Sequence, residues 1–128
     1  MIKKLGFVLF LILTFITSEV SYAQQFSSYI EGLPLHQSVF EDPDSVLVFD
    51  KPAGRIIQFS AYASDVSQNQ ILKFYKENLL KFGWQKLGQN QKTSQEINFF
   101  KGLEKLNIKL NQNDGIVMID FTLSPIKK

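Results

Sequence analysis

The chain has 128 residues, a formal net charge of +2 and 45% hydrophobic residues, which is the composition of a folded protein with a single hydrophobic core. It contains no cysteine and one histidine, so disulfides, cysteine nucleophiles and histidine-rich metal sites are excluded. The small net charge also argues against nucleic acid or an anionic membrane as a partner.

The first 23 residues have the three-part pattern of a secretory signal peptide. Two lysines at positions 3 and 4 precede an apolar run, and Ser21 and Ala23 place small residues where signal peptidase reads them. The 13 residues from Leu5 to Thr17 would form a helix about 20 Å long, whereas a bilayer core is about 30 Å thick. We therefore expect cleavage near Ala23, release into the periplasm or the medium, and no stable membrane anchor. The absence of cysteine also excludes lipoprotein processing.

The remaining 105 residues, with 12 basic and 11 acidic side chains, are enough for one domain. Residues 24–44 contain two prolines and an acidic cluster with little periodicity, which predicts an irregular lead-in segment. The domain itself is expected over residues 45–125. Its first elements are two strands, 46–49 and 55–63, joined as a hairpin by the turn sequence Lys51-Pro52-Ala53-Gly54.

A helix is predicted over residues 68–82. Ser67 and Gln70 have the spacing of a capping box, and Gly83 is a typical stop residue. One face of this helix is apolar and is expected to be buried; its residues are Ile71, Phe74, Tyr75, Leu79 and Phe82.

After Trp84 the hydrophobic residues recur at every second position, which indicates strands covered on one face. The inward series is Ile97, Phe99, Leu106, Ile108, Leu110, Val117, Ile119, Phe121 and Leu123. Asn113-Asp114-Gly115 predicts the last turn. The predicted fold is therefore α+β, with one helix packed on an antiparallel sheet of about five strands in the order β-β-α-β-β-β, or with one extra strand. Phe100, Leu103 and Met118 break the alternation, which indicates a partly apolar outer face.

Catalytic constellations are absent from the sequence. The single histidine, His36, is better explained as a solvated or turn-capping residue than as a metal ligand or base. The acids at positions 50, 65, 96 and 120 fit turns or the outer face, and no phosphate-binding loop is present. We expect no catalytic residue, no metal site and no cofactor.

Five residues are candidates for binding: Arg55, Tyr75, Trp84, Phe100 and Met118. The only arginine, Arg55, follows a rigid turn, where it could bind a carboxylate with two hydrogen bonds or form an ion pair with Asp50 across the hairpin. Tyr75 and Trp84 could line a groove at the helix and its exit, or belong to the core.

The residues Phe49-Asp50-Lys51-Pro52-Ala53-Gly54-Arg55-Ile56, followed by Phe74-Tyr75, Leu79, Gly83-Trp84 and Leu106-x-Ile108, form a pattern over most of Leu33 to Pro125. This pattern resembles small uncharacterised exported proteins of Gram-negative bacteria. It is also loosely similar to the small domains of lipoproteins that assist outer-membrane assembly, but this chain lacks their anchoring cysteine. The resemblance implies a soluble periplasmic protein.

Three functions are compatible with these features. The first is a non-enzymatic periplasmic binding or accessory module that recognises an envelope protein through the outer sheet face. The second is a small exported inhibitor or ligand carrier that uses the hairpin from Lys51 to Arg55. The third is an acid-base hydrolase built from scattered carboxylates. The oligomeric state is left open.

Overall fold

The structure is a computed structural model that describes residue 18, residues 23–86 and residues 95–126. The expected signal peptide lies outside the described residues, apart from Ser18 and Ala23. None of the helices in the described part of the chain is long and apolar enough to cross a membrane.

The fold of the described residues is α+β, as expected, and they contain one α-helix and antiparallel sheets. The strands are β1 (Gln25–Phe26), β2 (Pro34–Leu35), β3 (Val39–Glu41), β4 (Leu47–Lys51), β5 (Gly54–Ser64), β6 (Gln85–Lys86), β7 (Glu96–Lys101), β8 (Glu104–Asn113) and β9 (Ile116–Pro125). The helices are α1 (Gln68–Asn78) and two 3₁₀ turns, η1 (Pro43–Ser45) and η2 (Leu79–Phe82). The expectation of about five strands was too low, because short strands also form in the lead-in segment and after Trp84.

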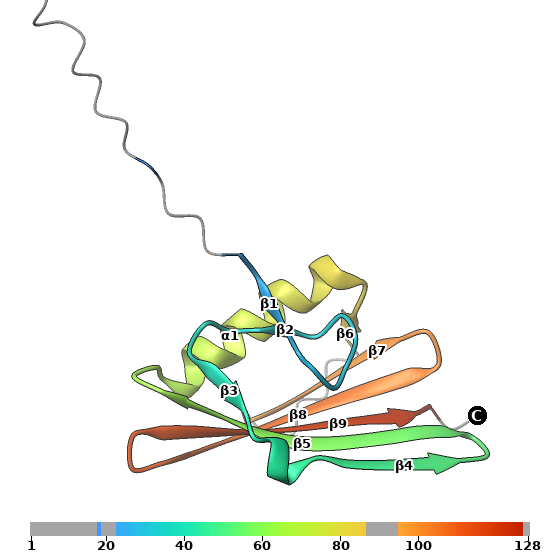
Figure 1. Ribbon diagram of the computed structural model, residues 1–128. Helices are drawn as coiled ribbons and strands as arrows, with labels where there is room; N and C mark the ends of the chain where they lie inside the picture. Colours follow the sequence, from blue (N-terminus) through green and yellow to red (C-terminus); the bar gives the residue numbers. More distant parts are fainter. Residues whose placement is uncertain (1–17, 19–22, 87–94, 127–128) are drawn as a thin grey trace, which may run out of the picture.

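The main sheet has seven strands in the order β3-β5-β9-β8-β7-β6, with β4 also paired to β5, while β1 and β2 form a separate two-stranded sheet. Figure 1 shows α1, β1 and β2 on the same side of the main sheet. We call this side the helix-side face and the opposite side the outer face. The described part of the chain therefore has two layers, and within it no α-helix lies on the outer face, which is bordered by the short turn η1.

The hairpin of β4 and β5 forms at the predicted turn sequence, but its loop has two residues and not the three that we expected, with Gly54 closing the loop. Lys51 pairs with Gly54, which leaves Pro52 and Ala53 as the turn residues. Gly54 has a φ of 137°, and a Cβ at this position would lie 3.2 Å from Pro125. Glycine is thus required both by the backbone conformation and by the close approach of the end of β9.

The helix begins where the capping box predicts and ends in a tighter turn. The Ser67 hydroxyl accepts from the Gln70 backbone N–H at 3.1 Å, and the Gln70 side chain accepts from the Ser67 N–H at 2.8 Å. The predicted helix over residues 68–82 is α-helical only to Asn78, and residues 79–82 form η2. Gly83 follows with a φ of 88°, as a left-handed stop residue.

Replacing the cap should destabilise the fold measurably. In Ser67→Ala the Gln70 N–H loses its acceptor, and we expect the free energy of unfolding to fall by about 1 kcal/mol in urea denaturation. Ser64→Ala, at the exposed end of β5, is the matched control and should change stability by much less. Equal losses in the two variants would mean that the capping box does not stabilise α1.

The core lies between the helix layer and the helix-side face. The predicted inward series of the last three strands is fully buried, together with Ile71, Leu72, Tyr75 and Leu79 of the helical segment. The strands β7, β8 and β9 therefore have the side-chain orientation that the alternation predicted. Phe74 and Phe82, which were expected in the buried stripe, are only partly buried and pack against the edge of the core.

The segment 24–44 differs from the expected irregular lead-in. It contains β1, β2 and β3, and it contributes Ile30, Leu33, Leu35 and Val39 to the core. The indole N–H of Trp84 donates to the Gly32 carbonyl at 2.9 Å, which ties this segment to the end of η2. The segment is therefore part of the packed domain.

Candidate binding surface

The outer face of the main sheet is not covered by α1, β1 or β2. Register places its side chains in rows that cross the strands. One row runs Phe40, Tyr62, Met118 and Asn111, and the next runs Ser60, Asp120, Lys109 and Glu96. The third row contains Leu47, Gln58, Thr122, Asn107 and Asn98, and the fourth contains Phe49, Ile56, Ser124, Lys105, Phe100 and Gln85. The face thus has apolar side chains mainly at its two ends and polar rows between them.

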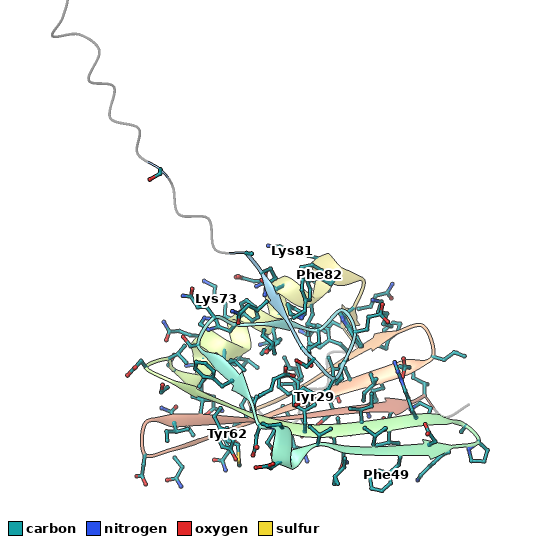
Figure 2. All side chains as sticks on the ribbon, in the orientation of Figure 1. Tyr29, Phe49, Tyr62, Lys73, Lys81 and Phe82 are labelled. Atoms are coloured by element: carbon teal, nitrogen blue, oxygen red, sulfur yellow. The ribbon has the colours of Figure 1, made fainter. Side chains whose placement is uncertain are left out.

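Five large apolar side chains on this face are exposed: Phe40 (71%), Leu47 (51%), Phe49 (50%), Ile116 (47%) and Tyr62 (39%). Figure 2 shows Phe49 and Tyr62 projecting from the side of the sheet that faces away from the helix. Phe40 lies directly opposite Tyr62, and Phe49 lies opposite Ile56. Neighbouring exposed apolar groups of this kind mark interaction sites more often than isolated ones do.

A hollow of about 370 Å³ lies between the apolar ends. It is lined by Ser45, Leu47, Gln58, Ser60, Lys109, Asp120 and Thr122, and it also borders Phe59 and Phe121, whose side chains are buried on the other face of the sheet. The Ser60 hydroxyl donates to the Asp120 carboxylate at 2.6 Å, and Lys109 lies opposite Asp120 on the neighbouring strand. One carboxylate, one ammonium group and several hydrogen-bonding groups therefore face the same hollow, where they can pair with polar groups of a partner.

The polar rows are held by side-chain hydrogen bonds across the strands. The Asn107 amide donates to Glu96 at 2.6 Å and to Asn98 at 2.8 Å. Near the edge, the Ser60 backbone N–H donates to the Ser45 hydroxyl at 2.8 Å, which fixes η1 against β5. These bonds limit side-chain motion before any partner binds, which lowers the entropy cost of association.

Phe100 and Met118 both lie on the outer face, as the broken alternation indicated, but they do not lie together. Met118 is next to Tyr62 in the first row, whereas Phe100 lies in the fourth row on β7. Phe100 and Met118 are only partly exposed. Leu103, the third residue that breaks the alternation, lies in the turn between β7 and β8. The apolar surface is therefore carried mainly by residues that were not among the candidates.

Arg55 and Trp84 line a different cavity, of about 330 Å³, together with Ile30, Glu31, Lys101, Gly102, Glu104 and Leu123. Arg55 forms an ion pair with Glu104 at 3.3 Å and not with Asp50, although Asp50 is its register partner. The Lys101 ammonium lies 5.6 Å from the Trp84 ring centroid, over its face. Charges of both signs thus line this cavity, and the guanidinium already has a carboxylate partner.

Tyr75 does not line a ligand groove. Its side chain is completely buried, with its ring 5.6 Å from that of Phe121, and its hydroxyl has no hydrogen-bond partner among the described residues. Burial raises the pKa of Tyr75 strongly and the Glu41 charge adds to this, while the backbone of His36 has a smaller opposite effect. Tyr75 belongs to the core, which was the alternative to the groove.

His36 caps a turn. Its Nδ1 accepts from the Ser38 backbone N–H at 3.0 Å, and its ring makes an edge contact with Phe74. Burial lowers the pKa of His36, which favours the neutral form that this hydrogen bond requires. In the described part of the chain, no three acidic or histidine side chains converge on a position that could hold a metal ion.

The exposed apolar residues of the outer face were not among the predicted binding residues, because the sequence marks them only weakly. The apolar run 46–49 is typical of a strand buried on both faces, but all five residues of β4 are exposed because this strand lies at the sheet edge. Tyr62 alternates along β5 with the buried Ala61 and Ala63, and this alternation by itself does not say which side of the strand is exposed. Phe40 was in the segment expected to be irregular.

Comparison with models of known protein families, with curated proteins and with solved structures finds no match to this chain. The protein is thus classified by its fold and its outer face alone, as a two-layer α+β protein with an exposed outer sheet face.

Proposed function

We propose that the protein is an exported, non-enzymatic binding module of the periplasm that recognises an envelope protein through its outer sheet face. The observation that carries this proposal is the pair of apolar ends on either side of a largely polar hollow. Phe40 and Tyr62 lie at one end, and Phe49 lies at the other, next to Leu47 at the rim of the hollow. Export is supported by the signal-like pattern of the first 23 residues.

A protein surface fits this face better than a small molecule does. The hollow is open, its walls are largely polar side chains, and the exposed aromatic groups lie outside it rather than around an enclosed cavity. Small-molecule sites are usually concave and mostly apolar. Aromatic residues and methionine are enriched in the cores of protein interfaces, and this face supplies both types.

The size of the apolar groups sets the expected affinity contribution. Full burial of one large apolar side chain contributes about 1.5–3 kcal/mol, and about 1.4 kcal/mol corresponds to a tenfold change in affinity. Phe40 and Tyr62, which are direct cross-strand neighbours, are therefore expected to dominate binding.

The test is affinity purification of the tagged protein from the envelope of its native host, followed by measurement of the affinity for the recovered protein. Phe40→Lys and Tyr62→Lys should each weaken binding by about tenfold or more, because each loses an apolar contact and places a charge in the interface. Leu80→Lys is the matched control, since Leu80 is 56% exposed and lies in η2, outside the outer face. Equal affinity of all three variants and the parent would contradict the proposal.

A ligand carrier is the second candidate, and one observation favours it. Arg55 and Trp84 are lining residues of the same cavity, although they are 29 positions apart in the sequence. An anionic ligand would have to displace the Glu104 carboxylate from Arg55. The outer face, which needs no such displacement, remains our first choice.

A further inference from the structure

The strand β4 leaves one backbone edge of the main sheet exposed. It is paired with β5 on one side, and on its other side no strand lies within the described part of the chain. Successive residues of an antiparallel strand alternate the direction of their N–H and C=O groups, so some of these groups point away from β5. Three consecutive apolar side chains, Leu47, Val48 and Phe49, are each half exposed or more. An exposed apolar edge of this kind is a template for pairing with another strand.

We propose that β4 pairs with β4 of a second copy of this chain, antiparallel, about a two-fold axis at Val48. Register decides the position of the axis. Leu47 and Phe49 lie on the outer face with Gln58 and Ile56, whereas Val48 lies on the helix-side face with Ile57. Opposed residues of paired strands lie on the same face of the sheet, so the axis has to pass through a residue and not between two.

An axis at Val48 gives apolar partners to all three side chains. Leu47 then lies opposite Phe49 of the second copy, Phe49 lies opposite its Leu47, and the two Val48 residues face each other. An axis at Phe49 would instead oppose Val48 to Asp50 and Leu47 to Lys51. Aromatic and aliphatic cross-strand pairs are the combinations that stabilise sheets, which favours the axis at Val48.

Opposite charges also lie near each other in this register. Lys51 at one end of β4 comes to lie opposite Ser45 of the second copy, beside the acidic residues Asp42 and Asp44 at η1. The two-fold axis repeats this contact at the other end. A two-fold interface uses the same patch on both copies, so a self-complementary edge of this kind fits a second copy of the chain better than an unrelated strand.

The expected dimer is weak and depends on concentration. The five residues of β4 are far fewer than the roughly 20–30 residues a side of a standard protein interface. Pairing would join the two outer faces into one continuous surface, with Leu47 and Phe49 of both copies at its centre. The inference is independent of the proposed function, because it requires only the edge of β4.

Single cysteines test the register, since the natural chain contains none. Directly opposed residues have Cα atoms about 4.5–5.5 Å apart, within the range of about 4.4–6.8 Å that a disulfide needs. Val48→Cys in the full chain should therefore form a covalent dimer under mild oxidation. Asp50→Cys, also exposed on β4, should not, because the Cα atoms at position 50 of the two copies would be offset by four residues, or about 13 Å along the strands.

Sedimentation over a concentration series completes the test. The unmodified protein should show a rising dimer fraction, and Val48→Lys, which places two ammonium groups face to face at the axis, should remain monomeric. Leu103→Lys, an exposed change in the turn between β7 and β8, should dimerise like the parent. A monomer at every concentration, or cross-linking of Asp50→Cys as efficient as that of Val48→Cys, would overturn the proposal.

Discussion

Replacing Phe121 by alanine is expected to lower the free energy of unfolding by about 3–5 kcal/mol, the usual cost of removing a buried phenylalanine side chain. Phe121 lies on β9 between β5 and β8, and it is 1% exposed. Its ring stacks on that of Phe59, with 4.9 Å between the ring centroids, and forms a T-shaped contact with the ring of Tyr75, with 5.6 Å between the centroids. The cavity would therefore open in the centre of the core, where helix and sheet meet.

Chemical denaturation monitored by circular dichroism measures this loss. Small domains have free energies of unfolding of about 5–15 kcal/mol, so the variant is expected to be marginally folded. Thr122→Ala, one residue further along β9 and on the outer face, is the control and should change stability by about 1 kcal/mol or less. A similar loss in both variants would contradict the position of the core on the helix-side face.

Tyr75→Phe is expected to stabilise the protein and to make its stability less sensitive to alkaline pH. At neutral pH the substitution removes a buried hydroxyl without a described partner, and the expected gain is about 1–3 kcal/mol. The ring contacts with Phe74 and Phe121 remain.

The pH effect follows from the raised pKa of Tyr75 in the folded state. Above the ordinary tyrosine pKa of about 10, the unfolded chain loses this proton while the folded chain retains it. The folded state then binds more protons, so the free energy of unfolding falls as the pH rises, by about 1.4 kcal/mol per pH unit for this group.

Denaturant melts at several pH values above 9 would show the difference. The parent should lose stability more steeply than Tyr75→Phe, whereas Tyr62→Phe, an exposed tyrosine on the outer face, should lose stability as steeply as the parent. Parallel pH profiles for the parent and Tyr75→Phe would show that Tyr75 is accessible to solvent in the folded protein.

Local sequence signals predicted the elements well where one interaction decides the structure. The capping box at Ser67 and Gln70 places the start of α1, and Asp114 and Gly115, both at positive φ, form the last turn as the Asn-Asp-Gly sequence predicts. Alternation identified the buried faces of β7, β8 and β9 because one side of these strands is covered by the helix layer and the other is not.

Long-range features were not accessible to the same reasoning. The pairing of β5 with β9 joins segments more than 50 residues apart, and no local signal specifies it. The edge position of β4 follows from that pairing, because β9 occupies the other side of β5. The run from Val46 to Phe49 was therefore interpreted as an ordinary strand, and its exposure, on which the binding surface and the proposed dimer depend, was not predicted.

The candidate residues show the same difference between local signals, which the sequence contains, and long-range contacts, which it does not reveal. Phe100 and Met118 were found on the outer face because their side follows from local alternation. Arg55 was expected either to bind a carboxylate ligand or to pair with Asp50, its neighbour in the hairpin. Its guanidinium instead pairs with Glu104, which is brought near by the pairing of β8 with β9. Trp84 and Tyr75 were ambiguous between core and groove, and both are buried.

Site-specific photo-crosslinking in the native host tests the central claim most directly. A photoreactive phenylalanine analogue is placed either at Phe40, on the outer face, or at Leu80 in η2; both native side chains are large, apolar and more than half exposed. Recognition through the outer sheet face predicts a covalent adduct with one envelope protein from position 40, its loss when Tyr62 is changed to lysine, and no such adduct from position 80. An adduct from position 80 without one from position 40 would contradict recognition through the outer sheet face.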